Sequence, residues 1–249
     1  MGRDRTRLGR TRLRDGLRAA WEERRRARVA VALAFFVGFL VWGPDGRVPL
    51  LDPVLAGLDP VVAWMVRFVA GALAMVALPW AAVRFVVTDE PRAAAEWGLG
   101  LGDWRRGLPI ALGLGLVLAA GTSVMAPGDP EVRATYPLFQ PAEPDRGLFW
   151  TYELVYLFFF MANELGMRGL LLFGLRRWTQ SPAAAVILAA IPQLVWHLHK
   201  PASEMWMAGF WGLLVGALAL GLRSAWWGVL FHWMSNVALD FALISRPPD

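Results

Sequence analysis

The sequence of 249 residues contains no cysteine. Disulfide bonds, thiolate metal sites and a cysteine nucleophile are therefore excluded. Charged side chains are scarce once the N-terminus is set aside, because residues 1–28 carry 15 of the 45 charged residues and the other 221 positions carry 30. A soluble protein has about 25% charged residues, whereas this chain has 18% charged and 57% hydrophobic residues. This composition predicts an integral membrane protein.

Lysine is also nearly absent, since Lys200 is the single lysine among 25 basic residues. The excess positive charge lies in residues 1–28, directly before a hydrophobic segment. Basic clusters beside a membrane span set its orientation and bind anionic lipid headgroups. We therefore interpret residues 1–28 as a basic cytoplasmic tail, either solvated or forming a surface helix. We expect membrane lipids as its partners and no binding to nucleic acid.

The rest of the chain, residues 29–249, is rich in hydrophobic segments long enough to cross the apolar core of a bilayer, which takes about 20 residues. Seven candidates and no sign of a soluble domain predict an all-α, polytopic transmembrane helical bundle that forms a single domain. A weakly apolar stretch within 88–107 leaves an eighth span open. The seven candidates lie at 29–42, 60–87, 108–126, 148–175, 182–199, 204–222 and 225–245.

The loops between these segments differ in their arginine content. The loops expected on the side of the tail, 88–107, 176–181 and 223–224, hold six arginines, and the opposite loops, 43–59 and 127–147, hold three. Basic residues are enriched in cytoplasmic loops, so the bias predicts a cytoplasmic N-terminus. We expect a multi-pass protein of the cell membrane, with a composition typical of a bacterial inner membrane.

Ionisable and amide side chains lie within the predicted spans of the last hundred residues. Such groups are costly in lipid and by default indicate a functional site. Glu164 and Arg168 are four residues apart, as are His232 and Asn236, so each pair lies on one face of its helix. Glu153 lies three helical turns before Glu164 and indicates that this face lines a polar cavity.

The fifth candidate span ends with two histidines, His197 and His199. Residues two apart point in different directions on a helix, so we expect His197 at the site and His199 at the membrane interface, with a metal-binding pair left open. Counting from the intervening turn places His197 at the same depth as Glu164. His232 lies only nine residues beyond Arg223 and needs a tilted or deeper-starting helix to join them.

A carboxylate, two imidazoles and an amide in one polar cavity suit the hydrolysis of an acyl bond by activated water. The carboxylate, alone or with a histidine, takes a proton from water, and a histidine with the asparagine stabilises the oxyanion. Zinc held by Glu164, His197 and His232 is an alternative source of the nucleophile. The first route requires no cofactor, so the sequence leaves the cofactor open between none and zinc.

Three short motifs in the C-terminal half resemble the CPBP family of intramembrane proteases, which process CAAX proteins and bacteriocins and are also called the Abi family. The family pattern is EExxxR, then FxxxH, then HxxxN, each motif on its own transmembrane helix. Here the motifs are NELGMR at 163–168, QLVWH at 193–197 and HWMSN at 232–236. The resemblance covers about a third of the chain and implies a CPBP-type core at about 148–245.

The resemblance implies an intramembrane endopeptidase that cleaves a membrane-associated protein or peptide with water activated by Glu164 and His197. The chain departs from the family pattern at Asn163, where the family has the glutamate to which water activation is mainly assigned, and at Gln193. A catalytically silent membrane scaffold or an immunity-type binding protein is therefore the alternative. The implied catalytic residues are Glu164, His197, His232 and Asn236, with Arg168 and Asn163 in support.

Overall fold

The computed structural model describes residues 15–22, 25, 28, 32, 52–82, 94–138, 146–198 and 200–246. Within these ranges the regular elements are helices and no strand is present. The predicted all-α class is therefore confirmed. Residues 15–22 of the basic tail are helical, and Leu17 and Trp21 are exposed on this helix.

Four helical segments of the described chain are long and apolar enough to cross a membrane. They correspond to the predicted spans 108–126, 148–175, 204–222 and 225–245. The second segment joins three elements end to end. The elements are α4 (Trp104–Met125) with the short η4 (Ala126–Gly128), α6 (Arg146–Glu164) with η5 (Leu165–Leu171) and α7 (Leu172–Thr179), α9 (Ala202–Leu222), and α10 (Trp226–Ser245).

The predicted spans 60–87 and 182–199 are helical over shorter apolar stretches. The predicted span 29–42 lies outside the described residues. Four helices of span length are thus established, and the total of seven stays a prediction. The two shorter apolar stretches are Pro60–Met75 within α3 (Pro60–Ala82) and α8 (Pro182–Val195); the remaining described elements are α2 (Asp52–Leu55), η3 (Ala94–Trp97) and α5 (Pro130–Thr135).

Residues 94–103, within the stretch where the sequence leaves an eighth span open, do not form a continuous helix. After η3 the backbone takes positive φ at Gly98 (70°) and Gly102 (53°), which stops a continuous helix. Asp103 then caps the N-terminus of α4 by accepting a hydrogen bond from the backbone N–H of Arg106. Residues 94–103 therefore form a short connection that ends where α4 begins.

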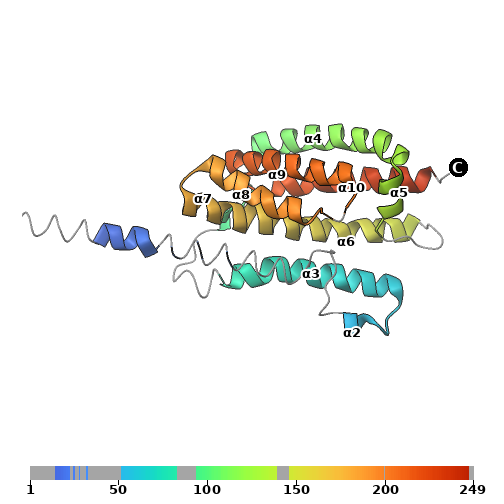
Figure 1. The fold of residues 1–249 in the computed structure, drawn as a ribbon, viewed down its shortest axis with the longest axis horizontal. Helices are drawn as coiled ribbons and strands as arrows, with labels where there is room; N and C mark the ends of the chain where they lie inside the picture. The colour runs from blue at the N-terminus through green and yellow to red at the C-terminus, as the bar shows by residue number, and fades with distance from the viewer. Residues whose placement is uncertain are drawn as a thin grey trace, which may run out of the picture.

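The helices lie side by side in layers, with α10 between α4 and α6, α8 against α9 and α7, and α3 along the outer side of α6 (Figure 1). Aromatic rings hold α3 to α6. Trp64 stacks on Tyr152 with ring centroids 4.7 Å apart, and Phe68 stacks on Tyr156 at 5.4 Å. This packing gives α6, which carries the first motif, neighbours on both sides.

The turn between α9 and α10 lies inside the molecule. Ser224 and Ala225 are each only 1% exposed, and the N–H of Ala225 donates to the carbonyl of Gly98 over 2.8 Å. The indole of Trp226 donates to the carbonyl of Leu99 over 2.8 Å. The residues just before α10 are thus buried, and these hydrogen bonds attach the start of α10 to residues 98 and 99.

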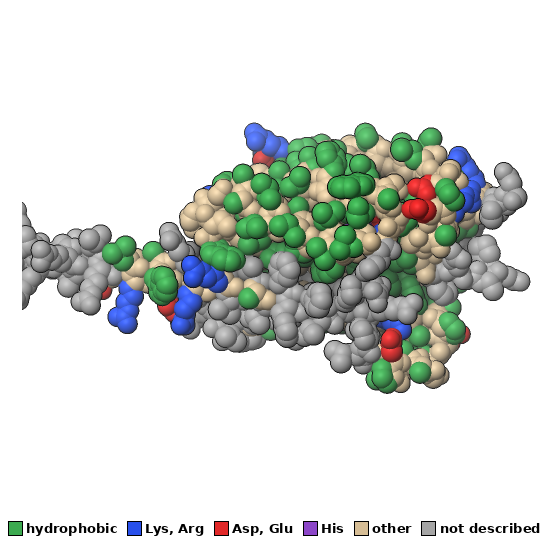
Figure 2. Space-filling model, in the orientation of Figure 1, with side chains coloured by type: hydrophobic (Ala, Val, Ile, Leu, Met, Phe, Trp, Pro, Cys, Tyr) green, Lys and Arg blue, Asp and Glu red, His purple; other side chains and the backbone are tan. Residues whose placement is uncertain are grey.

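The outer surface of the helices carries many large hydrophobic side chains. Figure 2 shows them spread over the middle of the bundle, with charged side chains toward its ends. On α4 they include Leu116, Val117 and Val124, which are 64–73% exposed. Together with the four helices of span length, this apolar surface indicates a membrane protein.

Candidate functional site

The first motif lies where the helix changes from α6 to η5, a π-helical segment that is buried throughout. Single π turns inside α-helices occur frequently at functional sites. Glu164 is the last residue of α6, and Arg168 lies within η5. The wider turn thus falls between the carboxylate and the guanidinium that the sequence predicts to pair.

Glu164 forms the centre of a buried ionic cluster. Its Oε1 lies 3.2 Å from Nη1 of Arg168 and 3.0 Å from Nδ1 of His232. The same Nη1 donates to Oε1 of Gln193 over 3.1 Å. The side chains of Glu164 and Arg168 are 1% and 5% exposed, whereas that of His232 is 33% exposed. The carboxylate is therefore held inside the protein while the imidazole reaches its surface.

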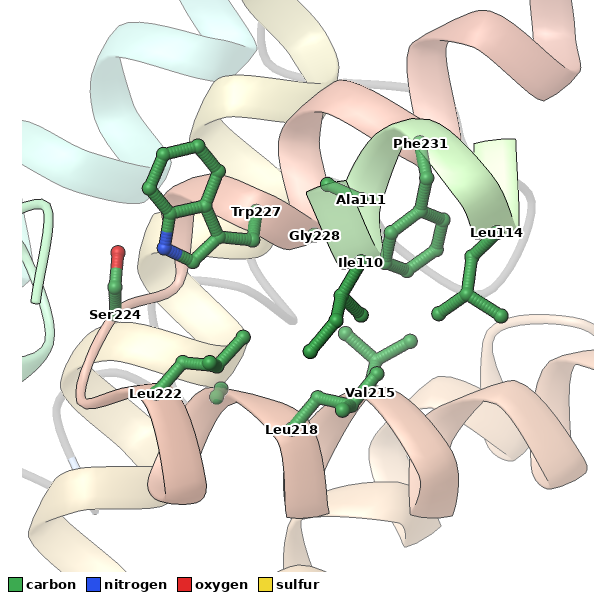
Figure 3. Close-up of a pocket in the computed structure, with 11 residues that line it drawn as sticks. Ile110, Ala111, Leu114, Val215, Leu218, Leu222, Ser224, Trp227, Gly228 and Phe231 are labelled. Carbon is green, nitrogen blue, oxygen red and sulfur yellow. The ribbon is translucent and has the colours of Figure 1, made fainter. Parts of the chain in front are cut away.

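Close approach of α10 to this carboxylate depends on a glycine. A Cβ on Gly228 would lie 2.6 Å from Oε2 of Glu164 and 3.2 Å from Cγ1 of Val215. Gly228 also lines a small crevice between α4, α9 and α10, shown in Figure 3, in which Ser224 supplies the hydroxyl group among otherwise mainly apolar side chains. This crevice is too apolar to hold hydrolytic chemistry, so the polar site lies on the Glu164 side of Gly228.

Asn163 is buried next to this cluster, at 5% exposure. Its Oδ1 makes no hydrogen bond within the described part of the chain. An amide cannot take a proton from water as a carboxylate does. The position that the resemblance associates with water activation therefore lacks a base in this chain.

His197 lies in the turn after α8 and does not contact Glu164. Its Nδ1 is 2.6 Å from the backbone carbonyl of Gln193, and its Nε2 is 3.6 Å from Oε1 of Glu204. Gln193 links the two regions, since its backbone contacts His197 and its side chain accepts from Arg168. The expectation that Glu164 and His197 would be the better-placed pair is thus wrong, because the direct imidazole partner of Glu164 is His232.

Glu204, in the first turn of α9, belongs to a second polar cluster with Tyr136 and Lys200. The phenol of Tyr136 donates to Oε1 of Glu204 over 2.6 Å, and Nζ of Lys200 donates to that phenol oxygen over 3.0 Å. Burial, followed by the charge of Glu204, raises the pKa of Tyr136 well above its usual value, so the phenol stays a donor. Burial lowers the pKa of Lys200.

Asn236 contacts a third group of side chains. Its Nδ2 donates to Oδ2 of Asp240 over 3.0 Å and to Oε2 of Glu153 over 3.4 Å. Both carboxylates are fully buried. Asn236 shares a face of α10 with His232, but its amide is directed to these carboxylates and not to Glu164. Glu153 thus lies beside Asn236, and the polar cavity that the sequence associates with it stays a prediction.

The three motifs therefore meet in the fold, although not as one hydrogen-bonded set. The first and third motifs touch through Glu164 and His232, and the second touches the first through Gln193. A search of family models recognises the same region. Residues 145–238 match the family described as type II CAAX prenyl endopeptidase Rce1-like. The predicted resemblance to CAAX-processing proteases is confirmed by this match.

The Rce1-like region spans the helices α6 to α10 over most of their length. It contains Glu164, Arg168, His197, Glu204 and His232, and it excludes Tyr136 and Asp240. No curated protein and no solved structure shows significant similarity to the chain. The match supports a protease-type family.

The zinc site considered from the sequence does not fit the Rce1-like region as folded. Zinc in a catalytic site takes three protein ligands that converge on one point. Glu164 and His232 are adjacent, but the ring of His197 faces Glu204. Among the described residues no three His, Asp or Glu side chains come together as a metal would require. We therefore derive no step through a metal.

Sequence reasoning missed Glu204, Tyr136 and Asp240 as members of polar clusters. Glu204 had a signal, since it is an acidic residue at the start of an apolar helix, seven residues after His197. Tyr136 lies 64 residues before Lys200 in a separate loop, and no spacing rule connects them. His199 lies outside the described residues.

Proposed function

We propose that the chain is an intramembrane endopeptidase that hydrolyses a peptide bond of a membrane-associated protein or peptide. The observation that carries the proposal is the Glu164–His232 contact, in which a buried carboxylate fixes an imidazole that is one-third exposed. A carboxylate on one ring nitrogen orients the other nitrogen toward a reacting group. The match of residues 145–238 to the Rce1-like family supports the same activity.

In this proposal the two histidines take different parts in acid–base catalysis. His197 accepts the proton of the attacking water, because the Gln193 carbonyl fixes the proton of its ring on Nδ1 and leaves Nε2 free. His232, in its protonated form, donates a proton to the departing nitrogen. Asn236, one turn further on α10, is the proposed amide donor to the oxyanion, a role that requires it to give up its longer hydrogen bond, the 3.4 Å contact to Glu153.

Glu164 acts on His232 in this scheme rather than on water. Its Oε1 is already shared by Arg168 and His232, and the side chain is 1% exposed. Asn163 and Arg168 support the cluster from the same helix. This assignment replaces the expectation that Glu164 and His197 activate the water together.

A second candidate function is a catalytically silent membrane scaffold or an immunity-type binding protein. The observation that favours it is Asn163, a buried amide at the position where the resembling proteases have a glutamate. A silent protein would keep the buried Glu164–Arg168 pair for stability alone. The two candidates differ in hydrolysis, which can be measured.

The deciding experiment is a cleavage assay with the purified full chain in proteoliposomes, against a library of membrane-anchored peptides. We expect cleavage by the wild type and its loss in His197→Ala and His232→Gln, with folding checked by circular dichroism. Asn163→Glu should raise the activity of a weakened enzyme. If the wild type and Asn163→Glu both leave every peptide intact, the scaffold function replaces the proposed one.

We also propose that the tail and the loop between α7 and α8 face the cytoplasm. The arginine bias of the loops supports this orientation. The chain has no native cysteine, so a single introduced cysteine is the only thiol that a membrane-impermeant reagent can label. In sealed cells Arg176→Cys should be protected and Glu131→Cys, on α5, should be labelled; the reverse pattern would invert the topology.

A further inference from the structure

The ring of His197 is held with one nitrogen against a carbonyl and the other toward a carboxylate. Because a carbonyl only accepts hydrogen bonds, Nδ1 at 2.6 Å from the Gln193 oxygen carries the ring proton. Nε2 of the neutral ring is then an acceptor. It faces Oε1 of Glu204 at 3.6 Å, which is beyond direct hydrogen-bond range.

Two acceptors that face each other need a proton donor between or beside them. Water is the smallest such donor, and it can give one hydrogen to an imidazole and one to a carboxylate. A water that donates both hydrogens has its oxygen lone pairs exposed for attack. The His197–Glu204 gap therefore has the geometry of a position for a nucleophilic water.

The surroundings of Glu204 leave it free to bind such a water. Oε1 receives the phenol hydrogen of Tyr136, while Oε2 is buried and makes no hydrogen bond to any described residue. No guanidinium of the described residues contacts Glu204, and its side chain is 24% exposed. Oε1, the oxygen that faces His197, keeps a second lone pair after accepting from the phenol, so it can also accept a hydrogen bond from a water.

Among the described residues of the Rce1-like region, the other two carboxylates, Glu153 and Glu164, are at most 1% exposed. Glu164 is 1% exposed and its Oε1 is bound by Arg168 and His232, and Asn163 is an amide. We propose that Glu204 is a catalytic residue, the carboxylate that binds and polarises the attacking water together with His197. This inference rests on the proposed peptidase function and assigns to α9 a role for which the three motifs supply no residue.

The proposed step balances as an ordinary hydrolysis. The water oxygen forms a bond to the substrate carbonyl carbon while one of its protons passes to Nε2 of His197. The second hydrogen stays on the attacking oxygen, hydrogen-bonded to Glu204, until the tetrahedral intermediate collapses. The C–N bond then breaks, and His232 donates its proton to the departing nitrogen. Tyr136 and Lys200 position Glu204, since they reach it through the phenol and do not touch the water.

The test compares kcat/KM of the full chain in proteoliposomes for four proteins: wild type, Glu204→Gln, Glu204→Asp and Glu131→Gln. Glu131 is a matched control, because its Oε2 accepts from the backbone N–H of Ala202 at the start of α9 without contacting His197. A positioned side chain that acts on a proton of the attacking water in the transition state contributes about 10²–10⁴-fold. We expect Glu204→Gln to lose at least 100-fold through kcat, Glu204→Asp to recover part of it, and Glu131→Gln to equal the wild type.

A second measurement detects the pairing of His197 with Glu204 without an activity assay. The chain has three histidines, so ¹⁵N spectra of histidine-labelled protein contain few imidazole signals, and His197→Asn assigns one of them. Removing an adjacent carboxylate destabilises the protonated ring, so Glu204→Gln should lower the titration midpoint of His197 by about one pH unit. Lys200 and His232, the other charged or titratable groups acting on His197, remain in every variant.

The outcomes separate the two proposals. Wild-type activity in Glu204→Gln overturns the role of Glu204 and leaves the peptidase intact. An inert wild type whose His197 signal still responds to Glu204→Gln overturns the peptidase and with it the catalytic role, although the two side chains interact. A His197 signal that Glu204→Gln does not move contradicts the proposed pairing, whatever the activity.

Discussion

The protein contains two carboxylate–histidine pairs that differ in almost every respect but composition. Glu164 and His232 come from α6 and α10, and the carboxylate is 1% exposed and neutralised by Arg168. Glu204 and His197 lie seven residues apart across the turn after α8, and the carboxylate is 24% exposed and hydrogen-bonded by a phenol. One carboxylate is enclosed in the core, and the other lies at its edge.

A carboxylate buried with an arginine is therefore better suited to orienting a neighbouring imidazole than to transferring a proton. A buried ion pair has two charges that depend on each other, so neither can change without a large cost. A partly exposed carboxylate that is not paired with an arginine can bind water at little cost. We therefore expect mutations in the first pair to affect folding and activity together, and mutations in the second to affect activity alone.

The largest expected effect is a difference in unfolding free energy between variants of the two pairs. Glu164→Gln leaves the guanidinium of Arg168 buried without a counter-charge, which costs about 3–5 kcal/mol of unfolding free energy. Glu204→Gln removes a partly exposed charge and should cost less than about 1 kcal/mol. Unfolding titrations in mixed micelles measure both. Equal losses in the two variants would abolish the distinction between the pairs.

The next effect tests how closely α10 must approach Glu164. In Gly228→Ala the added methyl group meets Oε2 of Glu164 and must push the helix or the carboxylate aside. Overpacking of this kind costs about 1–3 kcal/mol, and we expect a lower kcat because His232 moves with α10. Gly221→Ala is the control on α9, where a Cβ meets nothing within 4 Å. A stable and fully active Gly228→Ala would contradict the close approach.

A smaller effect tests the support of the second pair. Tyr136→Phe removes a hydrogen bond to a charged group, which is worth about 1.5–3 kcal/mol, and much of that loss should appear as a misplaced Glu204. We expect kcat/KM to fall about 10-fold, and the unfolding free energy to fall by no more than this hydrogen bond contributes. Thr135→Ala, which removes a hydroxyl bonded only within its own helix, should leave the rate unchanged. A rate loss in the control would point to the loop and not to the phenol.

The smallest effect concerns pH. Burial lowers the pKa of Lys200 in the folded protein. At a pH where the lysine is protonated in the unfolded chain, its burial therefore lowers the free energy of unfolding. The penalty falls as pH rises above the folded pKa toward the ordinary value of about 10.4. Unfolding free energy should therefore increase slightly with pH on the alkaline side up to about pH 10. Lys200→Met should flatten that slope, and an unchanged slope would assign it to other groups.

Much of the helical framework could be predicted from the sequence, because hydrophobic length is read directly from composition. The spans at α4, α6–α7, α9 and α10 were predicted from their apolar runs alone. The motif residues were also identified, since an ionisable group in such a run is conspicuous. The count of residues along the helices favoured His197 over His232 as the partner of Glu164, and this was wrong because the count assumed uniform helices.

Two features of the fold account for that failure. The π-helical η5 alters the helix between Glu164 and the following turn, and hydrogen bonds attach the start of α10 to residues 98 and 99. Neither leaves a simple periodic signal. Glu204 was overlooked for a related reason, since a carboxylate at the end of an apolar run looks like a membrane-interface residue until Tyr136 is placed beside it.

The covering of the α9–α10 turn by residues 94–103 has a consequence for the order in which the protein folds. The N–H of Asp103 donates to the carbonyl of Leu222, and a Cβ on Gly102 would lie 2.0 Å from the same oxygen. Residues 94–103 are synthesised early, but they can form these contacts only after α9 and α10 have been synthesised. The cooperative folding unit therefore extends to residues before the Rce1-like region. A fragment of residues 145–238 would leave the turn between α9 and α10 uncovered.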